Sequence, residues 1–215
     1  MSELWTVASR IHAILEFEAA LALALADAGI APPDEAEAVA AACAGQIDDP
    51  KTAWASTWER GTPLPAILEA VRRRLPDDQV GRWMHHGSTT QDAVDTTHML
   101  LAARSLLLLE TGMVDIAGTL LPMMETNRHQ PQMGRTFLQR ARPTTFGFRV
   151  ALWLDMVLDH IEGMRAMRSS LPVQLGGPVG DRGDYGAVAQ RVVDQLARRL
   201  DLNCVAFAVN GQRGV

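Results

Sequence analysis

The side chains best suited to chemistry lie in residues 85–92, which read HHGSTTQD. Four hydroxyl or amide side chains stand in a row just before a predicted helix: Ser88, Thr89, Thr90 and Gln91. Backbone N–H groups at a helix N-terminus, together with hydroxyl donors, form a cradle for a carboxylate or phosphate. The same residues also suit an ordinary helix cap, with Thr90 or Asp92 as the capping residue. The spacing alone favours the cap.

A second polar segment covers residues 134–147 and reads GRTFLQRARPTTFG. It is predicted to be a loop that leads into a helix at Pro143 or Thr144, which again suits anion binding. Its donor side chains include Arg135, Thr136, Gln139, Arg140 and Arg142. Taken alone, a solvated basic loop with a threonine cap explains the segment better.

A third segment, residues 175–183, is rich in glycine and reads LGGPVGDRG. It has neither the GxGxxG nor the GxxxxGK[ST] spacing of nucleotide-binding loops. Its glycines permit the close approach of a ligand or of another helix, and a plain surface turn fits equally well. No arrangement typical of a hydrolase is present.

Metal binding is not expected. His85 and His86 are adjacent, and neighbouring residues rarely converge on one ion. The two cysteines, Cys43 and Cys204, show no CxxC spacing, which indicates a reduced, cytoplasmic setting rather than a disulfide or zinc framework.

The composition narrows the class of protein. The chain has 215 residues and a net charge of −5, which argues against a nucleic-acid partner. Hydrophobic residues make up 47% and charged residues 21%, as in a packed globular protein. No uninterrupted apolar run approaches the roughly 20 residues of a membrane span, and the N-terminus does not read as a secretory signal. We therefore expect no membrane association.

The elements that must position these segments are helices, because apolar residues recur at three- and four-residue steps and β-branched clusters are scarce. The predicted fold class is all-α. A boundary near residue 110 predicts an N-terminal helical domain (1–110) and the first, incomplete part of a long-helix bundle (111–215). Pro122 suggests a kink or boundary in its helix. The helices are expected at 3–28, 32–44, 50–58, 65–74, 92–127, 144–169 and 184–200.

Taken together and in order, these segments resemble the fumarase/aspartase superfamily. Residues 85–96 are similar to its first signature, H-x-G-x-T-S-x-D-x-x-D-T, and residues 134–147 to its second, G-R-T-x-x-Q-x-A-x-P-x-T-x-G. Residues 13–21 resemble the family's opening helix, and residues 61–65 its turn before the first signature. The resemblance implies a fold with a central helical bundle and chemistry at a carbon next to a carboxylate.

Within the superfamily, the chain most resembles the bacterial branch of 3-carboxy-cis,cis-muconate cycloisomerases. Residues 91–96 and 174–177 look like that branch, and so does Phe137, which stands where fumarases and adenylosuccinate lyases carry a histidine. The branch adds a substrate carboxylate across a double bond to give a γ-lactone in aromatic-acid degradation. The alternative, a β-eliminase like adenylosuccinate or argininosuccinate lyase, is disfavoured by Phe137, because that reaction needs a proton donor for its leaving group.

The resemblance also implies roles for individual residues. The first signature would bind a carboxylate through Ser88, Thr89, Thr90 and Gln91. The second would support the opposite side of the substrate through Arg135, Thr136 and Gln139. His85 would be a polar or acid/base neighbour. The implied substrate is a small polycarboxylate, the implied assembly is a cytoplasmic homotetramer with sites where three subunits meet, and no cofactor or metal is implied.

Two departures from the family pattern shape the expectation for this chain. The third signature, with its serine base and its lysine, belongs beyond residue 215. Residues 208–213 resemble the stretch P-W-H-x-x-R, with Asn210 in place of the histidine. A third interpretation is therefore a catalytically silent, truncated homologue that associates with itself.

Overall fold

The computed structural model describes residues 2–206 and 208. The chain divides into two compact units, one formed by residues 1–104 and 170–215 and the other by residues 105–169. Asn210 lies outside the described residues. These units differ from the two domains expected from the sequence, 1–110 and 111–215. The expected domains stay a prediction.

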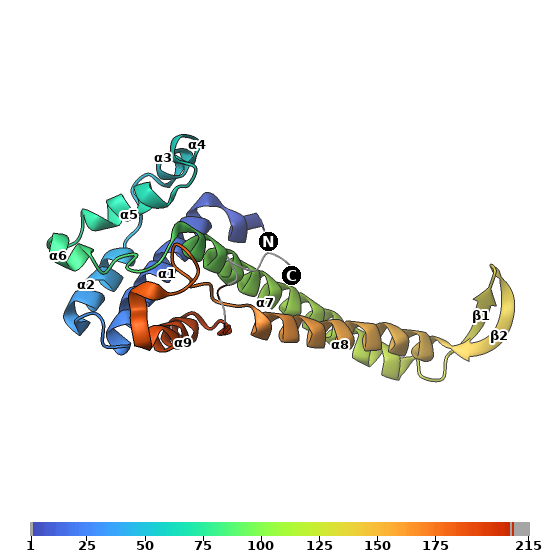
Figure 1. Cartoon of the computed structure of the whole chain (residues 1–215). Coiled ribbons are helices and arrows are strands. Elements are labelled where there is room, and N and C mark those ends of the chain that lie inside the picture. The colour runs from blue at the N-terminus through green and yellow to red at the C-terminus, as the bar shows by residue number, and fades with distance from the viewer. Residues whose placement is uncertain (1, 207, 209–215) are drawn as a thin grey trace. The chain divides into compact units, whose positions relative to one another are not determined.

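Helices dominate the described residues, and the all-α class is confirmed (Figure 1). The helices are α1 (Val7–Asp27), α2 (Pro33–Cys43), α3 (Pro50–Ala55), α4 (Thr57–Arg60), α5 (Leu64–Arg72), α6 (Asp78–Gly81), α7 (Thr90–Thr126), α8 (Phe146–Ser170) and α9 (Ala189–Leu200). Two 3-10 helices, η1 (Ser2–Trp5) and η2 (Gly183–Val188), and two strands, β1 (Pro131–Thr136) and β2 (Gln139–Thr145), complete the described elements.

Helix α1 forms the centre of the first unit and packs against α2 and α9. The sequence predicted one helix from residue 3, but Thr6 is extended and its hydroxyl accepts the N–H of Ser9 at 3.1 Å, so α1 begins at Val7. Gly29, at a φ of 81°, follows the end of the helix, as expected. Three of the largest buried side chains of the core come from this helix: Phe17, Leu21 and Leu25.

The first turns of α7 belong to the same unit, and their buried side chains include Ala93, Leu100 and Leu101. Helix α9 is amphipathic and buries Val192 and Leu196. These apolar side chains belong to one continuous core with those of α1, and that core fixes where α7 begins.

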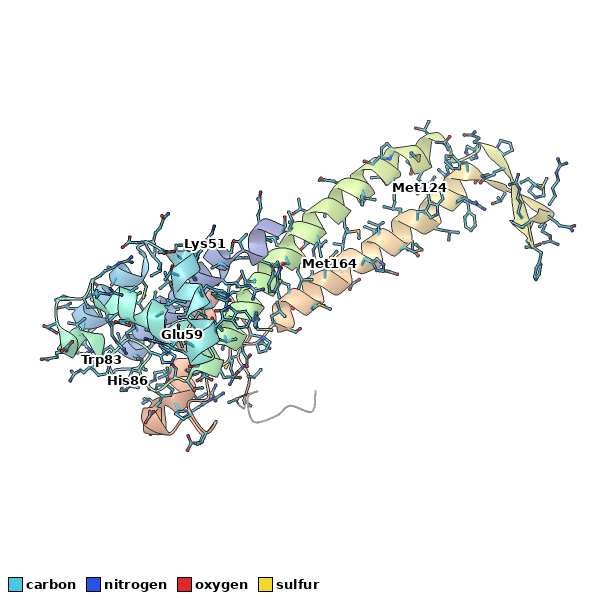
Figure 2. All side chains as sticks on the ribbon, turned by 90° about the horizontal axis from the view of Figure 1, so that it is seen from above. Lys51, Glu59, Trp83, His86, Met124 and Met164 are labelled. Atoms are coloured by element: carbon cyan, nitrogen blue, oxygen red, sulfur yellow. The ribbon has the colours of Figure 1, made fainter. Side chains whose placement is uncertain are left out.

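The second unit contains the rest of α7 and nearly all of α8, which run side by side in opposite directions (Figures 1 and 2). Arg165 of α8 donates from Nε to Oε1 of Glu110 at 2.6 Å. Both helices leave large apolar side chains exposed, among them Leu107, Leu108, Leu109, Val114, Ile116, Leu121, Phe148, Leu152, Trp153, Met156, Leu158 and Met167. Such an exposed apolar surface is typical of helices whose bundle is completed by further helices.

Helix α7 is also long and apolar enough to cross a membrane, judged by length and composition among the described residues. Its most apolar stretch has a mean hydropathy of 1.5. The sequence expectation counted uninterrupted apolar runs and so did not find this stretch. The interior of a helical bundle requires the same composition. Pro122 lies within α7, which continues past it to Thr126.

The predicted loop between these helices is instead a two-stranded antiparallel hairpin, which corrects the sequence interpretation. Thr136 pairs with Gln139, so Phe137 and Leu138 form the turn, with φ of 47° and 62°. Two positive φ values suit the twist of a tight hairpin. The register shifts between Met133 and Arg135, and a Cβ at Gly134 would lie 2.7 Å from a backbone oxygen. Glycine is therefore required at that irregularity.

Candidate functional site

The carboxylate of Asp92 joins two of the three polar segments. This side chain is fully buried at the start of α7. Its Oδ2 accepts the backbone N–H groups of Thr89 at 3.0 Å and Gly177 at 2.8 Å. Its Oδ1 accepts the backbone N–H of Gly176 at 2.9 Å and the side-chain amide of Gln174 at 3.1 Å. Four donors satisfy the buried charge and lock the glycine-rich segment onto the first signature segment.

The bond from Asp92 to Thr89 is a helix cap in its own right. Thr89 precedes the first helical residue, and Asp92 reaches back to its N–H as the third residue of the helix, in the manner of a capping box. The capping interpretation of this segment is thus correct for Asp92. This cap does not exclude an anion cradle, because within the segment Asp92 binds only the backbone N–H of Thr89.

A second pair of bonds continues this junction one turn along α7. The hydroxyl of Thr96 donates to the carbonyl of Gln174 at 3.0 Å and accepts the N–H of the same residue at 3.0 Å. Downstream, the buried Arg182 donates to the carbonyl of Leu175 at 2.9 Å. The glycine-rich segment is therefore a built part of the site region and not a plain surface turn.

Tyr185 closes the other side of the first signature segment. Its hydroxyl donates to the carbonyl of His86 at 2.9 Å, and its ring lies against Gly87. A Cβ at Gly87, whose φ is 67°, would come within 2.5 Å of that ring. Burial, followed by the charges of Asp92 and Asp184, raises the pKa of Tyr185, so the phenol remains a donor. Figure 2 marks His86 beside Trp83, whose ring it meets edge to face with 5.2 Å between centroids.

His85 is held from two directions. Its Nδ1 lies 2.7 Å from Oε1 of Glu18, a fully buried residue of α1, and 2.9 Å from Oγ of Ser88. The hydroxyl of Ser88 donates back to the His85 carbonyl at 3.2 Å. The backbone of His85 has a φ of 62°, a region that non-glycine residues seldom occupy.

The remaining predicted donors of the first segment lie at the beginning of α7. The hydroxyls of Thr89 and Thr90 form no hydrogen bond with the residues that the structure describes. Gln91 donates from Nε2 to Oδ1 of Asp95 at 2.6 Å. The first N–H groups of a helix have no intrahelical partner. The structure thus brings His85, Ser88, Thr89, Thr90 and Gln91 together as a half-buried surface with free donors.

The predicted residues of the second segment belong to the other compact unit. Arg135 and Thr136 are the last residues of β1, Gln139 begins β2, and all three are exposed. Phe137 lies at the turn between the strands with its side chain fully exposed. The hairpin therefore presents the second set of donors on either side of an exposed aromatic tip.

The sequence analysis did not predict three residues of the site region: Glu18, Asp92 and Tyr185. It considered Asp92 only as a helix cap. Each acts through a partner that is distant in sequence, by 67 positions for Glu18 with His85 and by 99 for Tyr185 with His86. A glutamate in the apolar stretch of the first helix was a signal that could have identified Glu18. In the part of the chain that the structure describes, no group of three His, Cys, Asp or Glu side chains is arranged to hold a metal ion.

Comparison with known proteins identifies the family of the chain. The family described as Lyase matches residues 1–210. The chain is 34% identical over 196 residues to the 3-carboxy-cis,cis-muconate cycloisomerase of Pseudomonas aeruginosa, which covers 90% of this chain and 43% of that protein. It is 30% identical over 207 residues to the adenylosuccinate lyase of Archaeoglobus fulgidus, which covers 94% of this chain and 44% of that protein.

A solved structure shows the same similarity. The 3-carboxy-cis,cis-muconate lactonizing enzyme of Pseudomonas putida superposes with a TM-score of 0.87 at 30% identity, over 99% of this chain and 49% of that one. The chain thus spans less than half the length of these relatives.

Proposed function

The chain belongs to the lyase family of the fumarase/aspartase superfamily, and from that premise we propose that it is part of a cycloisomerase that acts on 3-carboxy-cis,cis-muconate. The proposed reaction adds a carboxylate of the substrate across one of its own double bonds and gives a γ-lactone. Such a reaction belongs to aromatic-acid degradation. It needs no cofactor and no metal, and no group departs.

The observation that carries the proposal is the junction at Asp92. In this reaction negative charge builds up on a substrate carboxylate as the neighbouring carbon becomes carbanionic, and donors fixed in advance stabilise that charge. Asp92 holds the backbone of Thr89 and the glycine-rich segment in one position. The hydroxyls of Thr89 and Thr90 are thereby placed at the N-terminus of α7, where its dipole favours an anion.

The hairpin supports a substrate with more than one carboxylate. Arg135, Thr136 and Gln139 offer donors that suit a second carboxylate, with Arg135 able to bind it through two N–H groups. Phe137 supports the cycloisomerase over an eliminase, because lactone formation requires no proton donor for a leaving group. The net charge of −5 is no obstacle, since only the local field at the site need be positive.

The exposed apolar side chains of α7 and α8 support assembly into a homotetramer in which other copies cover them. The active site then needs residues from several copies, including the base of the third signature. We place the protein in the cytoplasm, with neither a membrane nor a nucleic acid as a partner.

The test is an assay of the native protein, purified at its natural length, with 3-carboxy-cis,cis-muconate. Lactone formation shortens the conjugated system, so the ultraviolet absorbance of the diene should fall. A folded, tetrameric protein that leaves the absorbance unchanged would contradict the proposed substrate.

The similarity to an adenylosuccinate lyase favours a β-eliminase as the second candidate. Adenylosuccinate in the same assay distinguishes the two, because fumarate release shows elimination. A catalytically silent, self-associating homologue is the outcome in which neither compound reacts.

A further inference from the structure

The imidazole of His85 lies between the core and the proposed cradle. Its side chain is 16% exposed, whereas that of Glu18, its partner, is 0% exposed. Nδ1 faces two oxygen acceptors, Oε1 of Glu18 at 2.7 Å and Oγ of Ser88 at 2.9 Å. Among the described residues, Nε2 has no hydrogen-bond partner. The ring therefore has one nitrogen committed to the protein and one that is available.

The chemistry of the acceptors decides where the proton resides. An ionised carboxylate can only accept, and the Ser88 hydroxyl already donates to the His85 carbonyl. A ring with its proton on Nε2 would place the lone pair of Nδ1 against the lone pairs of Glu18. A ring with its proton on Nδ1 satisfies Glu18 and leaves the lone pair of Nε2 free.

The environment of Glu18 shows that the contact is costly to maintain. The carboxylate lies within the apolar core, and its Oε2 is buried with no hydrogen-bond partner among the described residues. A buried carboxylate with one unpaired oxygen is destabilising unless its other interactions offset the cost. The left-handed backbone of His85 is a second unfavourable feature, at the partner residue of the same contact. Two unfavourable features at two residues in direct contact indicate a functional constraint.

We propose that Glu18 is a positioning residue that keeps a proton on Nδ1 of His85, so that Nε2 is the nitrogen that accepts or returns a proton when a substrate is bound. The role of Nε2 in the reaction rests on the proposed function, whereas the position of the proton does not. The hydrogen bond from Nδ1 to Glu18 fixes the tautomer and the orientation of the ring, and it leaves Nε2 for the substrate.

The experiment is ¹⁵N NMR of the native protein with selectively labelled histidine, recorded near pH 9. His85→Gln identifies the His85 signals among those of the other histidines. We expect a protonated, pyrrole-type Nδ1 in the wild type. A pyridine-type Nδ1 in the wild type overturns the proposal, and this measurement requires no variant at Glu18.

Glu18→Gln then removes the charge and keeps the shape. The glutamine amide can donate to Nδ1, so the pyridine-type signal should appear there. Glu16→Gln, two positions away on α1 and paired with Arg104, is the matched control and should leave the His85 spectrum unchanged. A Glu18→Gln spectrum identical to that of the wild type would show that Glu18 does not determine the proton's position.

Turnover separates this proposal from the proposed function. If the native protein converts 3-carboxy-cis,cis-muconate, Glu18→Gln should lower kcat about 100-fold with little change in KM. An unchanged kcat overturns the positioning role. A native protein with the Nδ1 proton in place and no turnover refutes the proposed function and leaves the tautomer assignment standing.

Discussion

Asp92 accepts the backbone N–H of Gly177 at 2.8 Å across 85 positions of sequence. This bond, together with those to Thr89 and Gly176, makes one buried carboxylate the organiser of two segments that the sequence shows only separately. Asp92 therefore stabilises the fold and shapes the proposed cradle at the same time.

Replacement of Asp92 by Asn should destabilise the first unit. An amide has one acceptor oxygen in place of two, and its NH2 group would face a backbone N–H. We expect the free energy of unfolding to fall by about 2–3 kcal/mol, as for a buried group left unsatisfied, when measured by urea denaturation. Asp95→Asn is the control, because Asp95 accepts only the Gln91 amide among its described contacts. Equal losses in the two variants would contradict the central role of Asp92.

Replacement of Gly87 by Ala should cost more stability than replacement of Gly29 by Ala. Both glycines have a positive φ, 67° and 81°, so both variants pay for backbone strain of about 1–2 kcal/mol. A Cβ at Gly29 meets nothing within 4 Å, whereas one at Gly87 meets the Tyr185 ring at 2.5 Å. Thermal unfolding of the two variants isolates the contribution of the clash. A Gly87→Ala variant as stable as Gly29→Ala would show that Tyr185 moves aside freely.

Replacement of Thr89 and Thr90 together by Val should weaken the binding of a polycarboxylate and leave the fold intact. Valine keeps the shape of threonine and removes the hydroxyl donor. If each hydroxyl contributes about 1 kcal/mol, the loss is roughly 10- to 30-fold in Kd, measured by calorimetry with 3-carboxy-cis,cis-muconate. Thr111→Val, farther along α7, removes a hydroxyl that bonds only to its own helix and should leave Kd unchanged. Unchanged binding in the double variant would remove both residues from the site.

Stability should fall as the pH rises above about 9, and Cys43 should account for part of the fall. Burial, followed by the charge of Glu18, raises the pKa of the Cys43 thiol from 9.0 to about 12. The unfolded chain then loses this proton near pH 9 while the folded chain keeps it. The contribution is fully present below pH 9 and is lost as the pH rises toward 12, by at most about 1.4 kcal/mol per pH unit.

Urea denaturation at about pH 7 and pH 10 measures this loss. Tyr185 adds a smaller part of it at pH 10, because its ordinary pKa is 10.0, above that of the thiol, and its folded pKa is also raised. Cys43→Ala should show a smaller difference between the two pH values than the wild type. Cys204→Ala should keep most of the difference, since that thiol is only partly buried. A Cys43→Ala variant with the wild-type difference would show that other groups cause the fall.

The sequence by itself determined the helices and the polar segments, because both are recorded in local patterns. Apolar residues at helical spacing predicted α1, α2, α5, α7, α8 and α9 to within a few residues. The order of two signature-like segments predicted the family, now confirmed. The hairpin was missed, because its strands are rich in arginine and contain neither valine nor isoleucine, and its stability depends on pairing between strands.

Only the tertiary structure decided how the site region is held. In the sequence Asp92 is only a candidate helix cap, and in the structure it also binds the glycine-rich segment. In the sequence Glu18 is only a polar residue of an apolar helix, and in the structure it contacts His85. Local propensity reports on neighbours within about one helical turn, whereas these contacts join residues 67 to 99 positions apart. Such contacts form only when a shared hydrophobic core brings α1, α7 and the segment after α8 together, and that packing determines which buried polar groups meet.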